Sequence, residues 1–160
     1  AACRCRCLLM ESKISFSMTP VKTIPSVRIK VLTMGEGGAG KSCLIKRYCE
    51  RKFVSRYVAT IGVDYGVKVI KLGSNEISVN FWDLAGHPEF FDIRNEFYKD
   101  TQAALLTFDV TSRQSFEKLG AWLKESIRFG ARPEGIAICG NKTDCPTRAV
   151  STTEANAWAA

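Results

Sequence analysis

The sequence predicts an α/β domain built on a doubly wound, mainly parallel sheet with one antiparallel strand. A glycine-rich loop at residues 35–42 lies between a strand-like and a helix-like segment. Further along the chain, strand and helix patterns alternate, which is typical of a parallel sheet covered by helices. Two adjacent strand-like segments, 63–72 and 76–83, are joined by the short turn Gly73-Ser74-Asn75, which predicts an antiparallel hairpin.

Length and composition limit the classes of protein to consider. At 160 residues, 46% of them hydrophobic, the chain can form one domain with its own core. The net charge is +7, but the basic residues are spread along the chain, which favours a solvated surface over nucleic-acid binding. No apolar run is long enough to span a bilayer. The single histidine, His87, excludes a His-rich zinc site and a pair of catalytic histidines.

Residues 1–26 differ from the domain that we expect at 27–160. They show no clear periodicity and begin with alternating cysteines and arginines. The cysteines are Cys3, Cys5 and Cys7. Palmitoylation and a transit peptide are alternatives, because basic residues separate the thiols and Glu11 is the only acid. A disordered leader, or sequence upstream of a start at Met10 or Met18, is favoured. The whole chain has seven cysteines, an odd number, and phosphate-binding loops such as the one that residues 35–42 suggest are usually intracellular. We therefore expect reduced thiols and a cytoplasmic protein.

The segment Gly35-Glu36-Gly37-Gly38-Ala39-Gly40-Lys41-Ser42 reads G-x-x-x-x-G-K-S, the signature of a phosphate-binding loop. Glycines let the backbone curl so that its N–H groups converge on phosphate oxygens. Lys41 supplies a cation for the β- and γ-phosphates, and the Ser42 hydroxyl is a ligand type that suits Mg²⁺. The alternative is a glycine-rich turn that matches by chance, but the strand at 27–34 and the helical spacing of 43–49 favour phosphate at a helix N-terminus. The predicted binding residues here are Gly35, Gly37, Gly38, Ala39, Gly40, Lys41, Ser42 and Cys43.

The rest of the chain supplies alternating elements. Residues 51–62 look like a loop, and 103–110 form a continuous apolar run expected of a buried strand. Residues 112–129 have helical apolar spacing, and 135–140 look like a second buried strand. Ser-Thr-Thr-Glu at 151–154 is a capping box that opens a short helix.

Two further motifs follow strands. Asp83-Leu84-Ala85-Gly86 can hold Mg²⁺ through the Asp83 carboxylate and meet a γ-phosphate with the Gly86 N–H. In Asn141-Lys142-Thr143-Asp144, the Asp144 carboxylate can accept from the guanine N1–H and exocyclic amine, which adenine does not present in that geometry. Alone, each motif fits an ordinary strand-end turn. All three in this order favour a guanine-nucleotide site over an ATP-using kinase or ATPase.

On these motifs the chain resembles the Ras superfamily of small GTPases, with their P-loop NTPase fold. Residues 60–65 are similar to the Rab branch, and residues 85–88 and 94–102 resemble Rab-like members that carry a C-terminal J domain. The resemblance covers residues 27–160. It implies GTP or GDP with Mg²⁺ as ligands. It also implies effector, exchange-factor and activating proteins as partners, and a role in signalling or vesicle trafficking.

The resemblance also implies roles for individual residues. Thr60 would contact Mg²⁺ and the γ-phosphate, completing a metal set with Ser42 and Asp83. Phe53 would pack on the guanine face, Lys142 would lie along the base, and residues 84–100 would form the second switch segment. The residues implied in hydrolysis are Lys41, Thr60 and His87.

The sequence departs from the family pattern in two ways. His87 stands where the family has a water-positioning glutamine, and Pro88 follows it. The place of His87 directly after Gly86 favours a γ-phosphate neighbour over a mere surface residue. His87 favours a GTPase-like scaffold with negligible hydrolysis, whereas the intact Lys41, Ser42, Thr60 and Asp83 favour a switch that hydrolyses GTP slowly. The S-A-K motif, final strand, final helix, J domain and prenylation cysteine of the family are not found. We therefore expect a C-terminally truncated fold with an open sheet edge and weak nucleotide retention.

Overall fold

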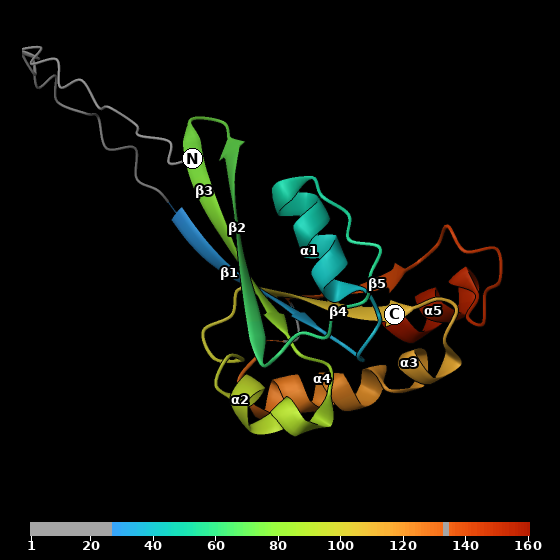
Figure 1. Ribbon diagram of the computed structural model, residues 1–160. Coiled ribbons are helices and arrows are strands. Elements are labelled where there is room, and N and C mark those ends of the chain that lie inside the picture. The colour runs from blue at the N-terminus through green and yellow to red at the C-terminus, as the bar shows by residue number, and fades with distance from the viewer. Residues whose placement is uncertain (1–26, 133–134) are drawn as a thin grey trace, which may run out of the picture.

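The computed structural model describes residues 27–132 and 135–160 (Figure 1). They form one sheet with helices against both of its faces, and within them no helix is both long and apolar enough to cross a membrane. The leader predicted at residues 1–26 lies outside the described residues.

The sheet has five strands in the order β2-β3-β1-β4-β5. Their bounds are β1 Val27–Met34, β2 Val63–Leu72, β3 Asn75–Leu84, β4 Ala103–Asp109 and β5 Ile136–Asn141. Only the β2–β3 pair is antiparallel, and the remaining three pairs are parallel. The predicted mainly parallel sheet and its hairpin are therefore confirmed.

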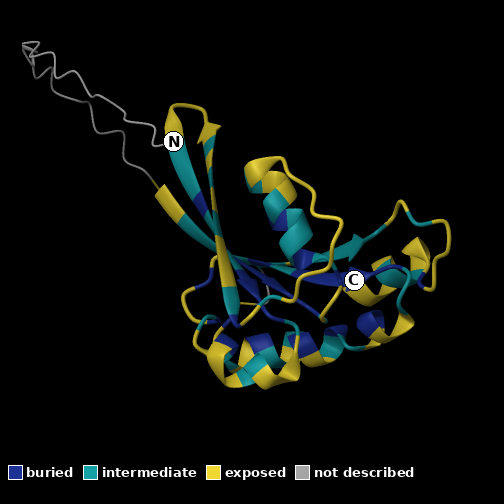
Figure 2. Cartoon of the chain, viewed as in Figure 1, coloured by how far each residue is buried: buried dark blue, intermediate teal, exposed yellow. Residues whose placement is uncertain are grey.

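Helices cover the sheet on both faces, as Figure 1 shows for α1 on one side and α2, α3 and α4 on the other. The helices are α1 Lys41–Glu50, α2 Phe91–Asn95, α3 Arg113–Glu117, α4 Leu119–Arg128 and α5 Thr152–Ala159. A short 3₁₀ turn, η1 Pro88–Phe90, precedes α2. Two apolar cores result, one under α1 and a larger one under α3 and α4, visible as dark blue segments in Figure 2.

Two local features follow directly from residue choice. Gly66 in β2 lets α1 lie close to the sheet, because a Cβ there would fall 3.0 Å from Ile45 Cγ2 and 3.4 Å from Cys49 Sγ. At the start of α5 the Ser151 hydroxyl accepts a hydrogen bond from the Glu154 N–H at 3.1 Å, so Ser151 caps the helix as predicted. The Glu154 carboxylate, the other half of the predicted capping box, pairs with Arg113 instead.

Two predictions about elements need correction. The helix predicted over 112–129 is two helices, because the backbone of Lys118 turns to ψ −7° and interrupts the regular helix between α3 and α4. Strand β5 is a strand as predicted but is not buried: every residue in it is half-buried or exposed (Figure 2). Among the described residues it has only β4 as a neighbour, which leaves its other edge open.

Candidate functional site

A cleft of about 620 Å³ lies at the carboxyl ends of β1, β3 and β5. This is the edge at which open α/β sheets bind ligands, because the loops that leave parallel strands meet there. The sequence-predicted residues that line it come from four separate segments. They are Gly37, Gly38, Gly40, Lys41, Ser42, Cys43, Phe53, Thr60, Gly86, His87, Asn141, Lys142 and Asp144.

The phosphate-binding loop, residues 35–42, forms the floor of the cleft. Gly38 and Gly40 have φ of 78° and 91°, the left-handed region that glycine adopts without strain. Gly40 also allows Asn141 to pack on the loop, since a Cβ there would lie 2.3 Å from Asn141 Nδ2. The Asn141 amide donates to the Ala39 carbonyl at 2.8 Å, so the third motif is tied to the first. The predicted residues Gly35 and Ala39 support the loop but do not line the cleft.

Lys41 is buried at the first turn of α1, and its ammonium donates to the carbonyls of Gly35 at 2.8 Å and Glu36 at 3.0 Å. Burial lowers the pKa of Lys41 from 10.5 to about 8, against the opposing attraction of Asp83 and Glu36. Two main-chain carbonyls are modest partners for a buried cation. Lys41 is therefore well suited to exchange them for the oxygens of an anionic ligand.

Three oxygen-bearing side chains meet beside the loop. The Ser42 hydroxyl hydrogen-bonds to Asp83 and lies 2.8 Å from the Thr60 hydroxyl, which is itself 3.5 Å from Asp83 Oδ2. The other Asp83 oxygen accepts from the Thr33 hydroxyl at 2.6 Å, so the buried carboxylate has a fixed orientation. Hydroxyl and carboxylate oxygens are the ligands that Mg²⁺ prefers, so the set predicted from sequence fits this ion.

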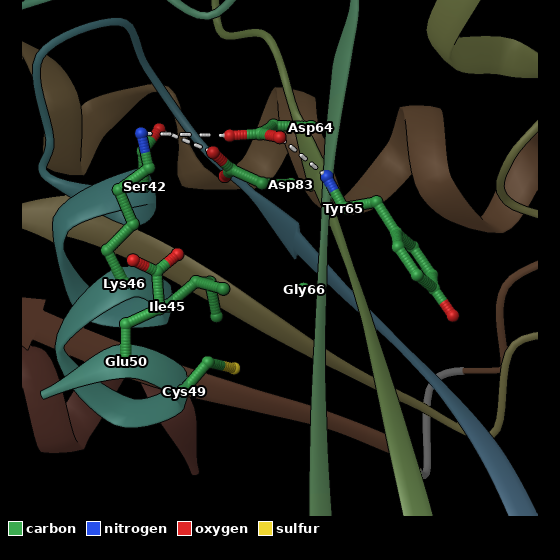
Figure 3. A pocket seen from close by; sticks show the side chains of 9 residues that line it. All are labelled: Ser42, Ile45, Lys46, Cys49, Glu50, Asp64, Tyr65, Gly66 and Asp83. Atoms are coloured by element: carbon green, nitrogen blue, oxygen red, sulfur yellow. Dashed lines mark hydrogen bonds and ion pairs between the residues drawn. The ribbon is translucent and has the colours of Figure 1, made fainter. Parts of the chain in front are cut away.

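A second, smaller cavity of about 220 Å³ adjoins this set, between α1 and β2. Figure 3 shows Ser42 and Lys46 of α1 directed toward Asp83 of β3 and Asp64 of β2. The Lys46 ammonium lies 3.9 Å from the Asp64 carboxylate and is substantially exposed, so this ion pair is weak.

At the far end of the cleft lies the Asn141-Lys142-Thr143-Asp144 turn. Lys142 has φ of 62°, and its ammonium pairs with the Asp109 carboxylate at 2.6 Å. Burial alone would raise the pKa of Asp109, but hydrogen bonds from Lys142 and Thr111 outweigh it and lower the pKa. Asp144 is exposed and lines the cleft.

The rim of the cleft carries the remaining predicted residues. Gly86 lies directly against the loop, since a Cβ would fall 2.3 Å from the Gly37 nitrogen. The His87 side chain is 67% exposed, and its Nδ1 lies 3.5 Å from the Glu89 N–H and 3.4 Å from the Glu89 carboxylate. Phe53 lies on the opposite rim with 69% exposure. The structure thus brings these residues to one cleft but leaves the His87 and Phe53 side chains largely free of packing contacts.

Several residues around the site carry no sequence signal. Asp109 and Arg94 belong to no motif, and their partners, Lys142 and Glu125, are distant in sequence. Glu36 occupies a variable position of the loop signature, yet its carboxylate pairs with Lys118 at 2.7 Å. A search of the sequence for acidic residues at the ends of buried strands could have suggested Asp109, the last residue of β4, but not its partner Lys142.

Comparison with known proteins places the chain in a family. The model of the Ras family matches residues 30–160, and we conclude that the chain belongs to the Ras family. It is similar to DnaJ homolog subfamily C member 27 of Rattus norvegicus, with 47% identity over 157 residues, covering 94% of this chain and 56% of the relative. The Homo sapiens protein of that name is 50% identical over 141 residues, covering 84% and 51%. The Danio rerio protein is 47% identical over 140 residues, covering 84% and 51%.

The chain thus spans about half the length of the curated relatives it matches. The name of those relatives agrees with the sequence-based resemblance to Rab-like proteins that carry a J domain. Ras-family domains bind GTP and GDP, generally with Mg²⁺.

Proposed function

We propose that residues 27–160 form a switch domain that binds GTP and GDP with Mg²⁺ and hydrolyses GTP slowly. The observation that carries the proposal is that one cleft joins three groups of residues. They are the phosphate-binding loop, the Ser42 and Thr60 hydroxyls, which contact Asp83 in the adjoining cavity, and the exposed Asp144 carboxylate. The first two suit phosphates and a divalent cation, and the third suits a guanine.

Each group has a defined task in this proposal. The loop N–H groups and the Lys41 ammonium bind the β- and γ-phosphates, while Ser42, Thr60 and Asp83 hold Mg²⁺, which supplies charge neutralisation at the phosphates when bound. Asp144 selects guanine by accepting two hydrogen bonds. Thr60 and Gly86 lie on loops that a γ-phosphate would order and hydrolysis would release, so partner proteins would read the difference.

GTP hydrolysis is the step of the proposed cycle that we expect to be slow. A glutamine amide can donate and accept at once, and a neutral imidazole can do so only with one nitrogen for each task on a rigid ring. The His87 imidazole lies against its own turn, where Pro88 begins η1. We infer a long-lived GTP state whose turnover depends on an activating partner. The same observation favours the second candidate, a cytoplasmic nucleotide-binding scaffold with negligible hydrolysis.

The test is a titration with fluorescent GDP, GTP and ATP, followed by single-turnover release of phosphate. We expect GDP to compete far better than ADP. Asp144→Asn should shift preference toward xanthine nucleotides, because the amide presents a donor where the carboxylate accepted. Asp100→Asn, at an exposed turn outside the cleft, is the matched control and should leave the preference unchanged. Equal competition by ADP and GDP would exclude the guanine assignment, and phosphate release indistinguishable from a no-protein control would favour the scaffold.

A further inference from the structure

Arg94 is a buried arginine whose neighbours in the chain are exposed or half-buried, and its guanidinium donates to two different segments. Nε and Nη2 donate to the two carboxylate oxygens of Glu125 on α4, at 2.6 and 2.8 Å. The remaining nitrogen, Nη1, donates to the main-chain carbonyl of His87 at 3.0 Å. Burial alone would lower the pKa of Arg94, but the hydrogen bonds and charge of Glu125 outweigh it and raise the pKa.

The carboxylate that holds Arg94 is itself fixed. Glu125 Oε1 also accepts from the hydroxyl of Tyr98, a side chain that is fully buried. Burial and the neighbouring Glu125 charge raise the pKa of the Tyr98 hydroxyl, so it stays a donor throughout the working pH range. The Glu125 carboxylate is therefore fixed by both Arg94 and Tyr98 in a low-dielectric environment, where a bidentate arginine–carboxylate pair is strongest.

A second set of contacts fixes the plane of the guanidinium. Arg94 lies over the ring of Trp122 at 4.4 Å from the ring centroid. The Trp122 indole N–H donates to the Glu36 carboxylate at 3.2 Å, and the other Glu36 oxygen pairs with Lys118 at 2.7 Å. Because Glu36 belongs to the phosphate-binding loop, the surface on which Arg94 stacks is anchored to the floor of the cleft.

These contacts stand in contrast to those of His87. Its imidazole is mostly exposed, whereas its carbonyl is held by a buried arginine. We propose that Arg94 is a positioning residue for GTP hydrolysis: it fixes the main chain of His87 at the rim of the cleft, so that only the side-chain torsions remain to be set by nucleotide or partner. This inference rests on the proposed function, because it assigns Arg94 a part in the same reaction. Lysine cannot replace the arginine, since one ammonium lacks the planar fork that serves Glu125 and His87 together.

The test compares two variants of the 160-residue chain with the wild type. Arg94→Lys keeps the charge but loses the fork. The double variant Arg94→Gln/Glu125→Gln removes both charges together, and so avoids leaving one of them buried without a partner. The matched control is Arg113→Lys, because Arg113 also pairs with acids and lies over an aromatic ring, but at an exposed position of α3.

Three measurements separate a positioning role from a merely structural one. We expect the dissociation constant for GDP to change less than twofold in both variants, and single-turnover hydrolysis at saturating Mg²⁺–GTP to fall about tenfold, equivalent to about 1.4 kcal/mol of barrier. Amide hydrogen exchange of residues 86–92 should accelerate at least tenfold while that of β4 is unchanged. Arg113→Lys should change none of the three.

Unchanged hydrolysis and unchanged exchange at residues 86–92 in both variants would overturn the inference, and so would equal acceleration of exchange in β4. If wild-type hydrolysis is too slow to detect, the exchange comparison decides alone. If the chain binds no nucleotide, the proposed function fails, and exchange in the nucleotide-free protein still decides whether Arg94 holds the His87 segment.

Discussion

The floor and the rim of the cleft are built differently. At the floor, Lys41 and the neighbouring Asp83 are buried, and Asn141 is tied to the loop by a hydrogen bond. At the rim, the side chains of His87 and Phe53 are exposed, with few polar contacts. The polar groups of the floor have fixed partners within the protein, whereas the exposed side chains of the rim have few.

This difference predicts which substitutions should change nucleotide affinity and which should change the rate of turnover. Changes in the floor remove interactions that act on every nucleotide, so they should affect binding itself. Changes at the rim should affect the rate of turnover and leave affinity almost unchanged, since the rim side chains contribute little to a fixed site. The following predictions run from the largest expected effect to the smallest, and each tests whether the floor controls affinity and the rim controls turnover.

Lys41→Ala should have the largest effect. Removing the ammonium deletes about two charge-assisted hydrogen bonds worth roughly 2 kcal/mol each, which corresponds to about a 10³-fold loss of affinity for GDP and GTP. Fluorescent-nucleotide titration measures it. Lys124→Ala, on the exposed face of α4, is the control. Wild-type affinity in the Lys41 variant would show that the floor is not the phosphate site.

Ser42→Asn should come next. The longer amide displaces the hydroxyl that shares a site with Thr60 and Asp83, so the Mg²⁺ site is weakened. We expect a loss of roughly 10–100-fold for Mg²⁺–GTP, about 1.4 to 2.7 kcal/mol, and a smaller loss for GDP, since Thr60 acts on the γ-phosphate through the same ion. Ser74→Asn in the β2–β3 turn is the control. Equal losses for the two nucleotides would contradict the role of Thr60.

Affinity should also depend on pH through Lys41. Its pKa in the free protein is about 8, and the charge of bound phosphates raises it, so binding takes up a proton above pH 8. Affinity should therefore be level well below pH 8 and fall above it, by at most about tenfold per pH unit. Calorimetry at pH 8.5 in two buffers of different ionisation enthalpy measures the number of protons taken up on nucleotide binding. The absence of proton uptake would mean that Lys41 is not desolvated in the free protein.

His87→Gln should have the smallest effect and should leave GDP affinity unchanged. The glutamine amide can orient a water without a change of charge, so we expect intrinsic single-turnover hydrolysis to rise about tenfold, or about 1.4 kcal/mol of barrier. Because Pro88 restricts the backbone that carries this side chain, the double variant His87→Gln/Pro88→Glu is measured alongside it. If the wild type hydrolyses GTP without a partner as fast as the double variant, His87 does not slow hydrolysis.

Part of this protein was determined by the sequence alone. The G-x-x-x-x-G-K-S loop predicts its own conformation, because glycines at fixed positions permit left-handed φ and an approach of Asn141 that no side chain would allow. The strands 27–34 and 63–72 and the Ser151 N-cap follow from patterns of neighbouring residues, so they could be predicted to within a residue or two.

Other features were decided only by the tertiary structure. The break between α3 and α4 falls at Lys118, whose side chain pairs with Glu36, a residue 82 positions away. Arg94 meets Glu125 across 31 positions, and β5 is half-buried because of its place in the sheet. Hydrophobic periodicity indicates which face of an element is buried, but not which residues of other elements lie against it. Pairings between distant charges depend on how the sheet orders its strands, so they appear only when the chain is folded.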